Sequence, residues 1–223
     1  MCEACWRALP RADGTRCAVC AESLAAADAE RCGRCWILPP AFCALRAAAP
    51  YRGSARSILL AFKFRGADYL GLHLARVMVE RIGAPDSAPD EVTAVPATGG
   101  ARRRRGYHAA SVLAESVAES LGVRYAPGRL RKIRETERQS GLALERRRSN
   151  VRGAFRVKGS PPRRILLVDD VATSGWTARE CASALVGAGA EEVDVWCFAR
   201  ASRDDADRDD ALSVASAGIP TRP

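Results

Sequence analysis

Two adjacent carboxylates followed by hydroxyl-bearing residues form the most informative motif of the sequence. The segment ILLVDDVATSGWTA, residues 165–178, begins with an apolar run typical of a buried strand and places Asp169 and Asp170 at its carboxyl end, where α/β sheets bind ligands. Successive backbone N–H groups, three hydroxyls and the start of a helix follow, and together they suit a phosphate monoester. The residues that we expect to hold this phosphate are Ala172, Thr173, Ser174, Gly175, Trp176 and Thr177.

The two carboxylates narrow the class of ligand. They would repel a phosphate but would accept hydrogen bonds from vicinal hydroxyls, so the motif predicts a ligand with a phosphate one sugar away from a diol, such as a ribose 5-phosphate. The loop is not a Walker A motif, because G-x-x-x-x-G-K-[ST] is absent. An Asp-capped helix with a polar first turn is the purely structural alternative, but it does not account for the whole combination.

Cysteines form a second motif near the N-terminus. Six of them make three C-x-x-C pairs with a period of 15 residues: Cys2/Cys5, Cys17/Cys20 and Cys32/Cys35. Two such pairs complete a tetrahedral thiolate site for zinc, and metal binding would supply the folding free energy that so short a segment lacks. A disulfide framework is the alternative, and it requires an oxidising compartment. We predict a structural Zn²⁺ bound by Cys17, Cys20, Cys32 and Cys35, with Cys2 and Cys5 as further candidate ligands.

The remaining cysteines and two nearby tryptophans have plainer interpretations. Cys43, Cys181 and Cys197 are expected to be small core residues. Trp6 and Trp36 each follow the second cysteine of a pair. We expect both to pack on the metal core rather than to stack on nucleic-acid bases.

Apolar periodicity predicts the elements that position these motifs. Strands are expected at 92–95, 155–157, 164–168 and 193–199, and helices at 54–64, 69–82, 109–121 and 177–187. The strand–helix–strand order over 164–199 indicates a βαβ unit of a doubly wound α/β fold. The stretch 38–50 is expected to be a linker or a docking segment that closes the cysteine-rich segment. The predicted organisation is a cysteine-rich segment at 1–43, an α/β domain at 44–201 and a disordered acidic tail at 202–223.

The basic residues are clustered. The chain of 223 residues has a formal net charge of +9, and residues 101–164 alone hold 18 basic and 5 acidic residues. The cations are almost all arginine, and Lys63, Lys132 and Lys158 are the only lysines. A GC-rich coding bias explains arginine in place of lysine but not the clustering. The cluster therefore predicts a polyanionic partner, either nucleic acid or a phosphorylated small molecule.

The strand–loop–helix motif resembles the phosphoribosyl pyrophosphate (PRPP) signature of type I phosphoribosyltransferases. From Cys2 to about Arg200 the chain resembles the ComF family, whose members join N-terminal zinc knuckles to such a domain. Four further segments carry the resemblance: FKFRG (62–66), RRRRGYHAASVLA (102–114), RETERQSGL (134–142) and RRRSNVRGAF (146–155). The resemblance implies a phosphoribosyltransferase-like parallel sheet flanked by helices.

The resemblance also implies roles for individual residues. Asp169 and Asp170 would bind the ribose hydroxyls and, with Arg105, form the catalytic set. The pyrophosphate loop would comprise Val95, Pro96, Ala97 and Thr98. A flexible hood closing over the site would include Arg134, Thr136, Gln139, Arg147 and Asn150. Mg²⁺ would bridge pyrophosphate and ribose oxygens, because bare pyrophosphate is too highly charged to leave readily.

The chain departs from the family pattern at two positions near this site. His108 and Ala109 stand where the family has Asn-Gln, so an amide pair is missing near the pyrophosphate end. His108 is either a general base or a polar residue at a helix start. Trp176 replaces a small residue of the phosphate loop, and it must point outward or narrow the pocket.

Two functions fit these observations. The first is a protein that binds PRPP or another phosphorylated, nucleotide-like ligand, as a phosphoribosyltransferase would, with the accessory role in DNA uptake that the family resemblance implies. The second is a single-stranded nucleic-acid-binding protein with a non-catalytic PRPP-like site, for which DNA and proteins of the DNA-uptake machinery would be the partners. An aromatic content of 6% offers few stacking platforms.

The sequence contains no run of about 18 apolar residues, so membrane insertion is not expected. The N-terminal residues show no basic region before an apolar one, so we expect no signal peptide and a cytoplasmic location.

Overall fold

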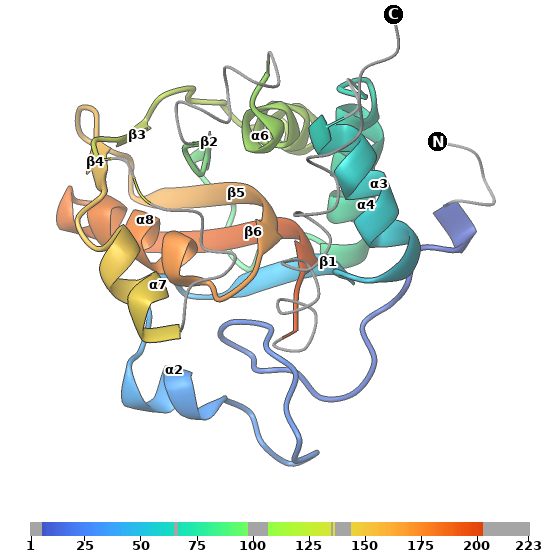
Figure 1. The fold of residues 1–223 in the computed structure, drawn as a ribbon. Helices are drawn as coiled ribbons and strands as arrows, with labels where there is room; N and C mark the ends of the chain where they lie inside the picture. Colours follow the sequence, from blue (N-terminus) through green and yellow to red (C-terminus); the bar gives the residue numbers. More distant parts are fainter. Residues whose placement is uncertain (1–5, 65–66, 98–106, 135, 137–143, 203–223) are drawn as a thin grey trace, which may run out of the picture.

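The computed structural model describes residues 6–64, 67–97, 107–134, 136 and 144–202. Within these ranges a four-stranded parallel sheet forms the centre of the molecule, in the strand order β1-β6-β5-β2 (Figure 1). The strands are β1 (Leu45–Pro50), β2 (Glu91–Ala94), β5 (Arg164–Ala172) and β6 (Glu192–Arg200). The predicted α/β fold with a parallel sheet is confirmed.

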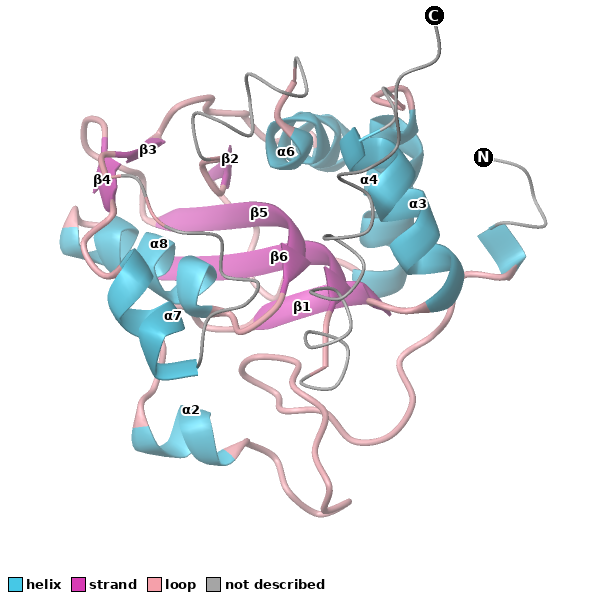
Figure 2. Ribbon diagram, in the orientation of Figure 1, coloured by secondary structure: helices cyan, strands magenta, loops and turns pink. Residues whose placement is uncertain are grey.

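Helices cover both faces of the sheet (Figure 2). Helices α3 (Gly53–Phe64), α4 (Leu70–Ile82) and α6 (Ala109–Leu121) share a hydrophobic core with one face. Helix α8 (Trp176–Gly187) covers the other face, and α7 (Leu144–Val151) contacts α8. Because both faces are covered, the central strands are apolar on both sides, as parallel sheets require.

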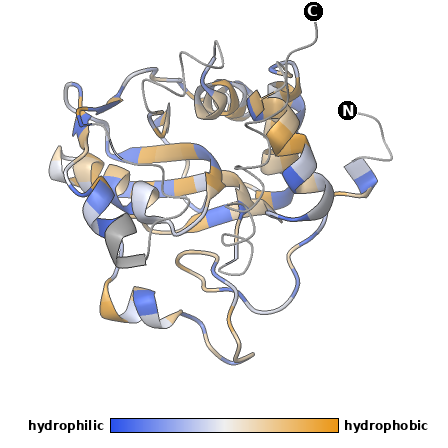
Figure 3. Ribbon diagram, viewed as in Figure 1, coloured by the Kyte–Doolittle hydropathy of each residue, from blue (hydrophilic) through white to orange (hydrophobic). Residues whose placement is uncertain are grey.

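Strand β5 shows how the sequence builds these two cores. Side chains alternate across a strand, so Leu166 and Val168 enter the core beneath α3, α4 and α6. Ile165 and Leu167 enter the core beneath α8. All four are buried, which explains the unbroken apolar run in the sequence. Figure 3 shows this hydrophobic band along the centre of β5.

The part of the cysteine-rich segment that carries the four clustered cysteines belongs to the α8 side of the molecule. Its helix α2 (Gly33–Ile37) begins directly after Cys32. The side chains of Cys17, Cys20, Cys32 and Cys35 are members of the same hydrophobic cluster as residues of α8. The four cysteines therefore pack on the sheet face that α8 covers, whereas Leu9 packs into the core of the opposite face.

A small antiparallel hairpin lies outside the main sheet. It consists of β3 (Leu130–Lys132) and β4 (Phe155–Val157), with Leu130 opposite Val157 and Lys132 opposite Phe155. Helix α7 falls in the connection between its two strands. The hairpin thus joins the two ends of the segment that was expected to form the hood.

Most predicted elements are confirmed, and two expectations are corrected. Helix α6 has the predicted bounds and ends at Gly122, whose left-handed backbone (φ 65°) suits glycine. The stretch 38–50, expected to be a linker or a docking segment, is instead a strand in its second half, because residues 45–50 form β1 and pair with β6. Strand β5 continues past Val168 to Ala172, because β6 pairs with it as far as Arg200.

Within the described part of the chain, no helix is both long and apolar enough to cross a membrane. The expected domain boundaries stay predictions. The expected tail falls, from residue 203 onward, outside the described residues.

Candidate functional site

The two adjacent carboxylates lie within strand β5, near the end of its pairing with β6, rather than after the strand. Asp169 is paired with Cys197 of β6, and the pairing continues beyond Asp170. The Oδ1 atom of Asp169 accepts a hydrogen bond from the backbone N–H of Asp170 at 2.8 Å. Both side chains are therefore held at the carboxyl end of the sheet, where a parallel α/β fold binds its ligands.

A lysine that the sequence analysis left without a role completes this carboxylate pair. The Nζ atom of Lys63, near the end of α3, lies 2.7 Å from Oδ1 of Asp170. The two side chains are only 17% and 14% exposed, so the ion pair is shielded from water. The segment FKFRG supported the family resemblance, but no local pattern linked its lysine to a distant aspartate.

Asp169 lies in an environment that disfavours the ionised form of its carboxyl group. Burial, together with the neighbouring charge of Asp170, raises the pKa of Asp169 to about 8, although Lys63 opposes this shift. At neutral pH the Asp169 carboxyl is mostly protonated, while Asp170 forms the ion pair. A neutral carboxyl beside a carboxylate can both donate to and accept from vicinal hydroxyls.

The predicted phosphate loop connects β5 to α8. Gly175 occupies the N-cap position of α8 with φ 77° and ψ 0°, a left-handed conformation that favours glycine. Ala172 and Ser174 are buried, while Thr173 and Thr177 are half-buried. The loop thus sits at the positive end of a 12-residue helix, directly after the two aspartates.

Trp176 does not point outward into solvent. Its side chain is buried in the core on the α8 face. Three guanidinium groups lie over the indole ring, those of Arg34, Arg148 and Arg179, at 5.9, 5.6 and 5.3 Å from its centroid. Of the two orientations that the sequence allowed for Trp176, the outward one is wrong, because the core and these cations enclose the ring.

The predicted pyrophosphate loop follows β2, beside β5. The backbone N–H of Val95 donates to the carbonyl of Val168 at 2.9 Å, which extends the pairing of the two strands. Pro96 and Ala97 line a cavity of about 910 Å³. Thr98 and Arg105 fall outside the residues that the structure describes.

The walls of this cavity come from the start of α6, the segment after Tyr125 and the hairpin strand β3. They include three cations: Arg131, Lys132 and Arg134. His108 is the N-cap residue of α6, and its Nδ1 atom lies 2.6 Å from Oγ of Ser111. The structure therefore places His108 at a helix start and on the wall of the cavity.

The hood residues that the structure describes are tied to the hairpin. Arg134 donates from Nη2 to the backbone carbonyls of Asn150 and Arg152, each at 2.9 Å. The Nζ atom of Lys132 donates to Oγ1 of Thr136. Gln139 and the side chain of Arg147 lie outside the described residues. Closure of this segment over the site stays a prediction.

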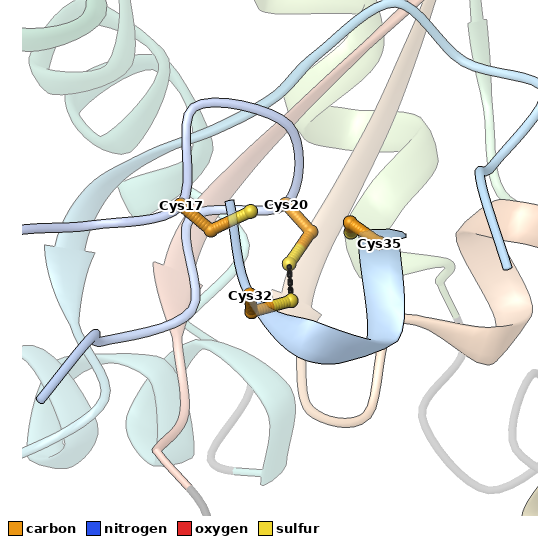
Figure 4. Close-up of side chains that lie close together, drawn as sticks. All are labelled: Cys17, Cys20, Cys32 and Cys35. Atoms are coloured by element: carbon orange, nitrogen blue, oxygen red, sulfur yellow. Dashed lines mark hydrogen bonds between the residues drawn. The ribbon is translucent and has the colours of Figure 1, made fainter. Parts of the chain in front are cut away.

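The four cysteines predicted to bind zinc converge on one point (Figure 4). Their sulfur atoms all lie within 4.8 Å of one another, and the sulfurs of Cys20 and Cys32 are 3.6 Å apart. Zn–S bonds of about 2.3 Å in a tetrahedron place sulfurs roughly 3.8 Å apart, so this arrangement fits the metal. Cys2 and Cys5 lie outside the described residues.

The chemistry of the cluster also fits a metal-thiolate site. Burial disfavours ionisation of Cys17, but backbone N–H groups at Cys32, Cys20 and Val19 lower its pKa to about 7. Burial raises the pKa of Cys20 to about 11. The described cysteines are all free thiols. A cluster with one readily ionised thiol and three neighbours is suited to a cation that stabilises the remaining thiolates.

The other cysteines and tryptophans follow the sequence expectations only in part. Cys181 and Cys197 are buried in the core, as expected, but Cys43 is exposed. The expectation that Trp36 packs on the metal core is wrong, because this side chain is 69% exposed. Trp6 packs against the core of the opposite sheet face.

Arginines that the sequence analysis did not single out join the cysteine cluster to the phosphate loop. Arg34 lies between two of the cysteines, whereas Arg179 belongs to α8 and Arg200 ends β6. Arg179 and Arg200 are 5% and 2% exposed, which is rare for a cation unless it is fully hydrogen-bonded. In an arginine-rich sequence, no local signal distinguishes these three residues from the others.

No family model matches the chain. It is 30% identical over 206 residues to DNA utilization protein YhgH of Escherichia coli K12, covering 90% of each chain. It is 29% identical to competence protein F of Haemophilus influenzae, over 76% of this chain and 78% of that one. Among solved structures, adenine phosphoribosyltransferase of Leishmania tarentolae is similar over 65% of this chain and 77% of that one, with 16% identity and a TM-score of 0.38. The chain belongs to the ComF family, that of DNA utilization protein YhgH and competence protein F.

Proposed function

We propose that the chain binds PRPP, or another ligand containing ribose 5-phosphate, at the carboxyl end of β5 and that this binding serves DNA uptake or utilization. One observation carries the proposal: a half-buried pair of carboxyl groups directly precedes a glycine-containing loop at the N-terminus of α8. The names of the relatives, DNA utilization protein and competence protein, support the biological setting.

A different set of residues would bind each part of the ligand. The backbone N–H groups and hydroxyls of 172–177, with the helix dipole of α8, would hold the 5-phosphate. Asp169 and Asp170 would hold the ribose hydroxyls, and the predicted pyrophosphate loop, 95–98, would lie beside the pyrophosphate. The cations of the cavity wall, Arg131, Lys132 and Arg134, would offset the charge of the pyrophosphate.

Magnesium fits the same site, because carboxylate oxygens are its preferred protein ligands: Asp170 offers them, and Asp169 would offer them once the ion displaces its proton. When bound with PRPP, the ion would neutralise part of the pyrophosphate charge. Lys63 holds Asp170 in place through their 2.7 Å contact.

Calorimetry tests the ligand assignment. PRPP should bind in the presence of Mg²⁺, and Asp169→Asn and Asp170→Asn should each weaken its affinity by about tenfold, as expected when a carboxyl group that meets the ribose hydroxyls or Mg²⁺ becomes an amide. Asp86→Asn is the matched control, because Asp86 is 79% exposed and pairs with Arg46 at the opposite end of the sheet. Equal PRPP affinity in all four proteins would refute the assignment.

Single-stranded DNA binding is a second candidate function, and a specific surface favours it. Trp36 and Ile37 of α2 are 69% and 87% exposed. The guanidinium of Arg31 lies 5.6 Å from the Trp36 ring centroid. An exposed indole beside a cation can stack on a base while the cation meets a phosphate.

Fluorescence anisotropy with a labelled single strand tests this function. Affinity should fall steeply with salt, and Trp36→Ala should weaken it by about tenfold, in line with the loss of one stacked base. Tyr69→Ala is the control, because Tyr69 is an equally exposed aromatic residue on α4's side of the molecule. An equal affinity change in both variants would exclude Trp36 as a stacking platform, and a flat salt response would exclude binding through phosphate contacts.

A further inference from the structure

The phosphate loop has a rear side that is held by arginines. Arg34 donates from Nη1 to the carbonyl of Ser174 at 2.6 Å. Arg200 donates from Nη1 to the carbonyl of Ala172 at 3.0 Å and also to that of Thr173. Three consecutive carbonyls of the loop are therefore fixed by two guanidinium groups.

These contacts determine where the N–H groups of the loop point. In a trans peptide the C=O of one residue and the N–H of the next point in opposite directions. With the carbonyls of residues 172, 173 and 174 turned toward the arginines, the N–H groups of residues 173, 174 and 175 point away from them. That is the side from which a phosphate would be bound by a nest of N–H groups.

The same arginines are anchored in the cysteine-rich segment. Arg200 donates from Nε to the carbonyl of Cys20 at 3.1 Å and from Nη2 to Oε2 of Glu22 at 2.5 Å. Arg34 lies between Cys32 and Cys35 in the chain. Arg179 adds a third link, because its Nη2 atom lies 3.1 Å from Sγ of Cys35.

The buried links leave little room for independent movement. The side chains of Arg200 and Glu22 are 2% and 10% exposed. If the turn that carries Cys20 shifted, Arg200 would have to give up its contacts either with that turn or with the loop. A buried guanidinium without partners is costly, so the two sites are expected to change together.

We propose that the four-cysteine cluster is the rear support of the phosphate loop, and that metal binding at the cluster and phosphate binding at the loop are energetically coupled through Arg34 and Arg200. Both arginines are positioning residues that act on the ligand through the backbone of residues 172–175. The coupling to a bound ligand rests on the proposed function, whereas the support of the loop does not. Because linkage is reciprocal, a ligand that binds the ordered loop raises the affinity of the cluster for its metal by the same factor.

The test uses the full zinc-loaded chain. Zinc affinity is measured by competition with a zinc-selective chelator, with and without saturating ribose 5-phosphate. We expect ribose 5-phosphate to raise zinc affinity by about tenfold, within the range usual for coupled sites. In Arg34→Ala the increase should be lost, and Arg34→Lys should restore part of it. The partial recovery in Arg34→Lys separates this effect from a general loss of folding.

Arg52→Ala is the matched control. Arg52 forms an exposed ion pair with Asp13 of the cysteine-rich segment, and within the described part of the chain no hydrogen bond or ion pair joins it to the loop. This variant should keep the full increase. Arg34 is only half-buried, so Arg34→Ala should fold even if substitution of Arg200, which would leave Glu22 unpaired, prevents folding.

A second measurement separates this inference from the proposed function. Amide hydrogen exchange of residues 173–175, without ligand, should speed up by about tenfold in Arg34→Ala but not in Arg52→Ala. If exchange responds in this way while calorimetry detects no ribose 5-phosphate or PRPP binding, the proposed function fails and the support role stands. If the ligand binds but neither zinc affinity nor exchange responds, the coupling is refuted and the proposed function stands.

Discussion

Replacing Asp169 by asparagine should stabilise the protein while it weakens ligand binding. Asp169 is held beside Asp170 in a half-buried site, and this environment raises its pKa to about 8. Asparagine has nearly the same shape and no charge to bury. A residue that destabilises the free protein but binds a ligand is typical of a functional site. An aspartate that only capped its helix would stabilise the protein instead.

The magnitude follows from the two pKa values. An aspartate in the unfolded chain has a pKa of about 3.9, so the folded chain holds this proton to higher pH. The contribution of the group to stability is therefore greatest below about pH 4 and is lost as the pH rises toward 8. At about 1.4 kcal/mol for each pH unit, the stability of the wild type should fall by about 4 kcal/mol relative to Asp169→Asn between pH 5 and pH 8.

Urea unfolding of both proteins, with zinc present at each pH, measures this difference. Subtracting the two unfolding free energies cancels the pH dependence of the cysteine cluster, because both proteins contain it. Asp86→Asn serves as the control, since this exposed residue should show no comparable pH-dependent difference. A variant that is about 1 kcal/mol less stable than the wild type at every pH would identify Asp169 as a simple cap and would refute the reasoning.

Three further outcomes are expected. Lys63→Met should lower the free energy of unfolding in urea by about 3 kcal/mol, because it leaves Asp170 half-buried and unpaired, and adding Asp170→Asn should recover part of that loss. Gly175→Ala should destabilise the chain by about 1 kcal/mol in the same assay through its left-handed backbone alone, since no neighbouring atom lies within 4 Å of an added Cβ. Cys20→Ser should reduce zinc content, measured by mass spectrometry of the purified protein, whereas Cys43→Ser should not, because Cys43 is outside the cluster.

Local patterns account for the parts of the fold that were predicted. Helix α6 combines apolar periodicity with a glycine that stops it, and both signals lie within one short segment. The cysteine cluster was predictable for a similar reason, because a C-x-x-C turn brings its own two sulfurs together. In each case, residues close in sequence determine the result.

Tertiary pairing accounts for what was missed. The segment LRAAAP has little intrinsic preference for a strand, and it forms β1 because β6 offers it a parallel edge. The Lys63–Asp170 pair joins α3 to β5, and Arg200 joins β6 to the turn at Cys20. Such contacts depend on how elements stack, which hydrophobic periodicity does not specify. Lys63 nevertheless had one compositional signal, because it is one of only three lysines in an arginine-rich chain.

The structure also changes the meaning of the basic excess at residues 101–164. Several of these cations have acidic partners: Arg129 pairs with the buried Glu91, and Arg164 pairs with Asp90. Arg134 donates hydrogen bonds to backbone carbonyls, so it supports the hairpin and also lines the cavity. The slope of log K against log salt for a single strand is about −0.7 for each phosphate neutralised. Because paired arginines release no counterions, the slope should be much shallower than the charge count of this region implies, and a slope matching the full count would mean that DNA breaks these ion pairs.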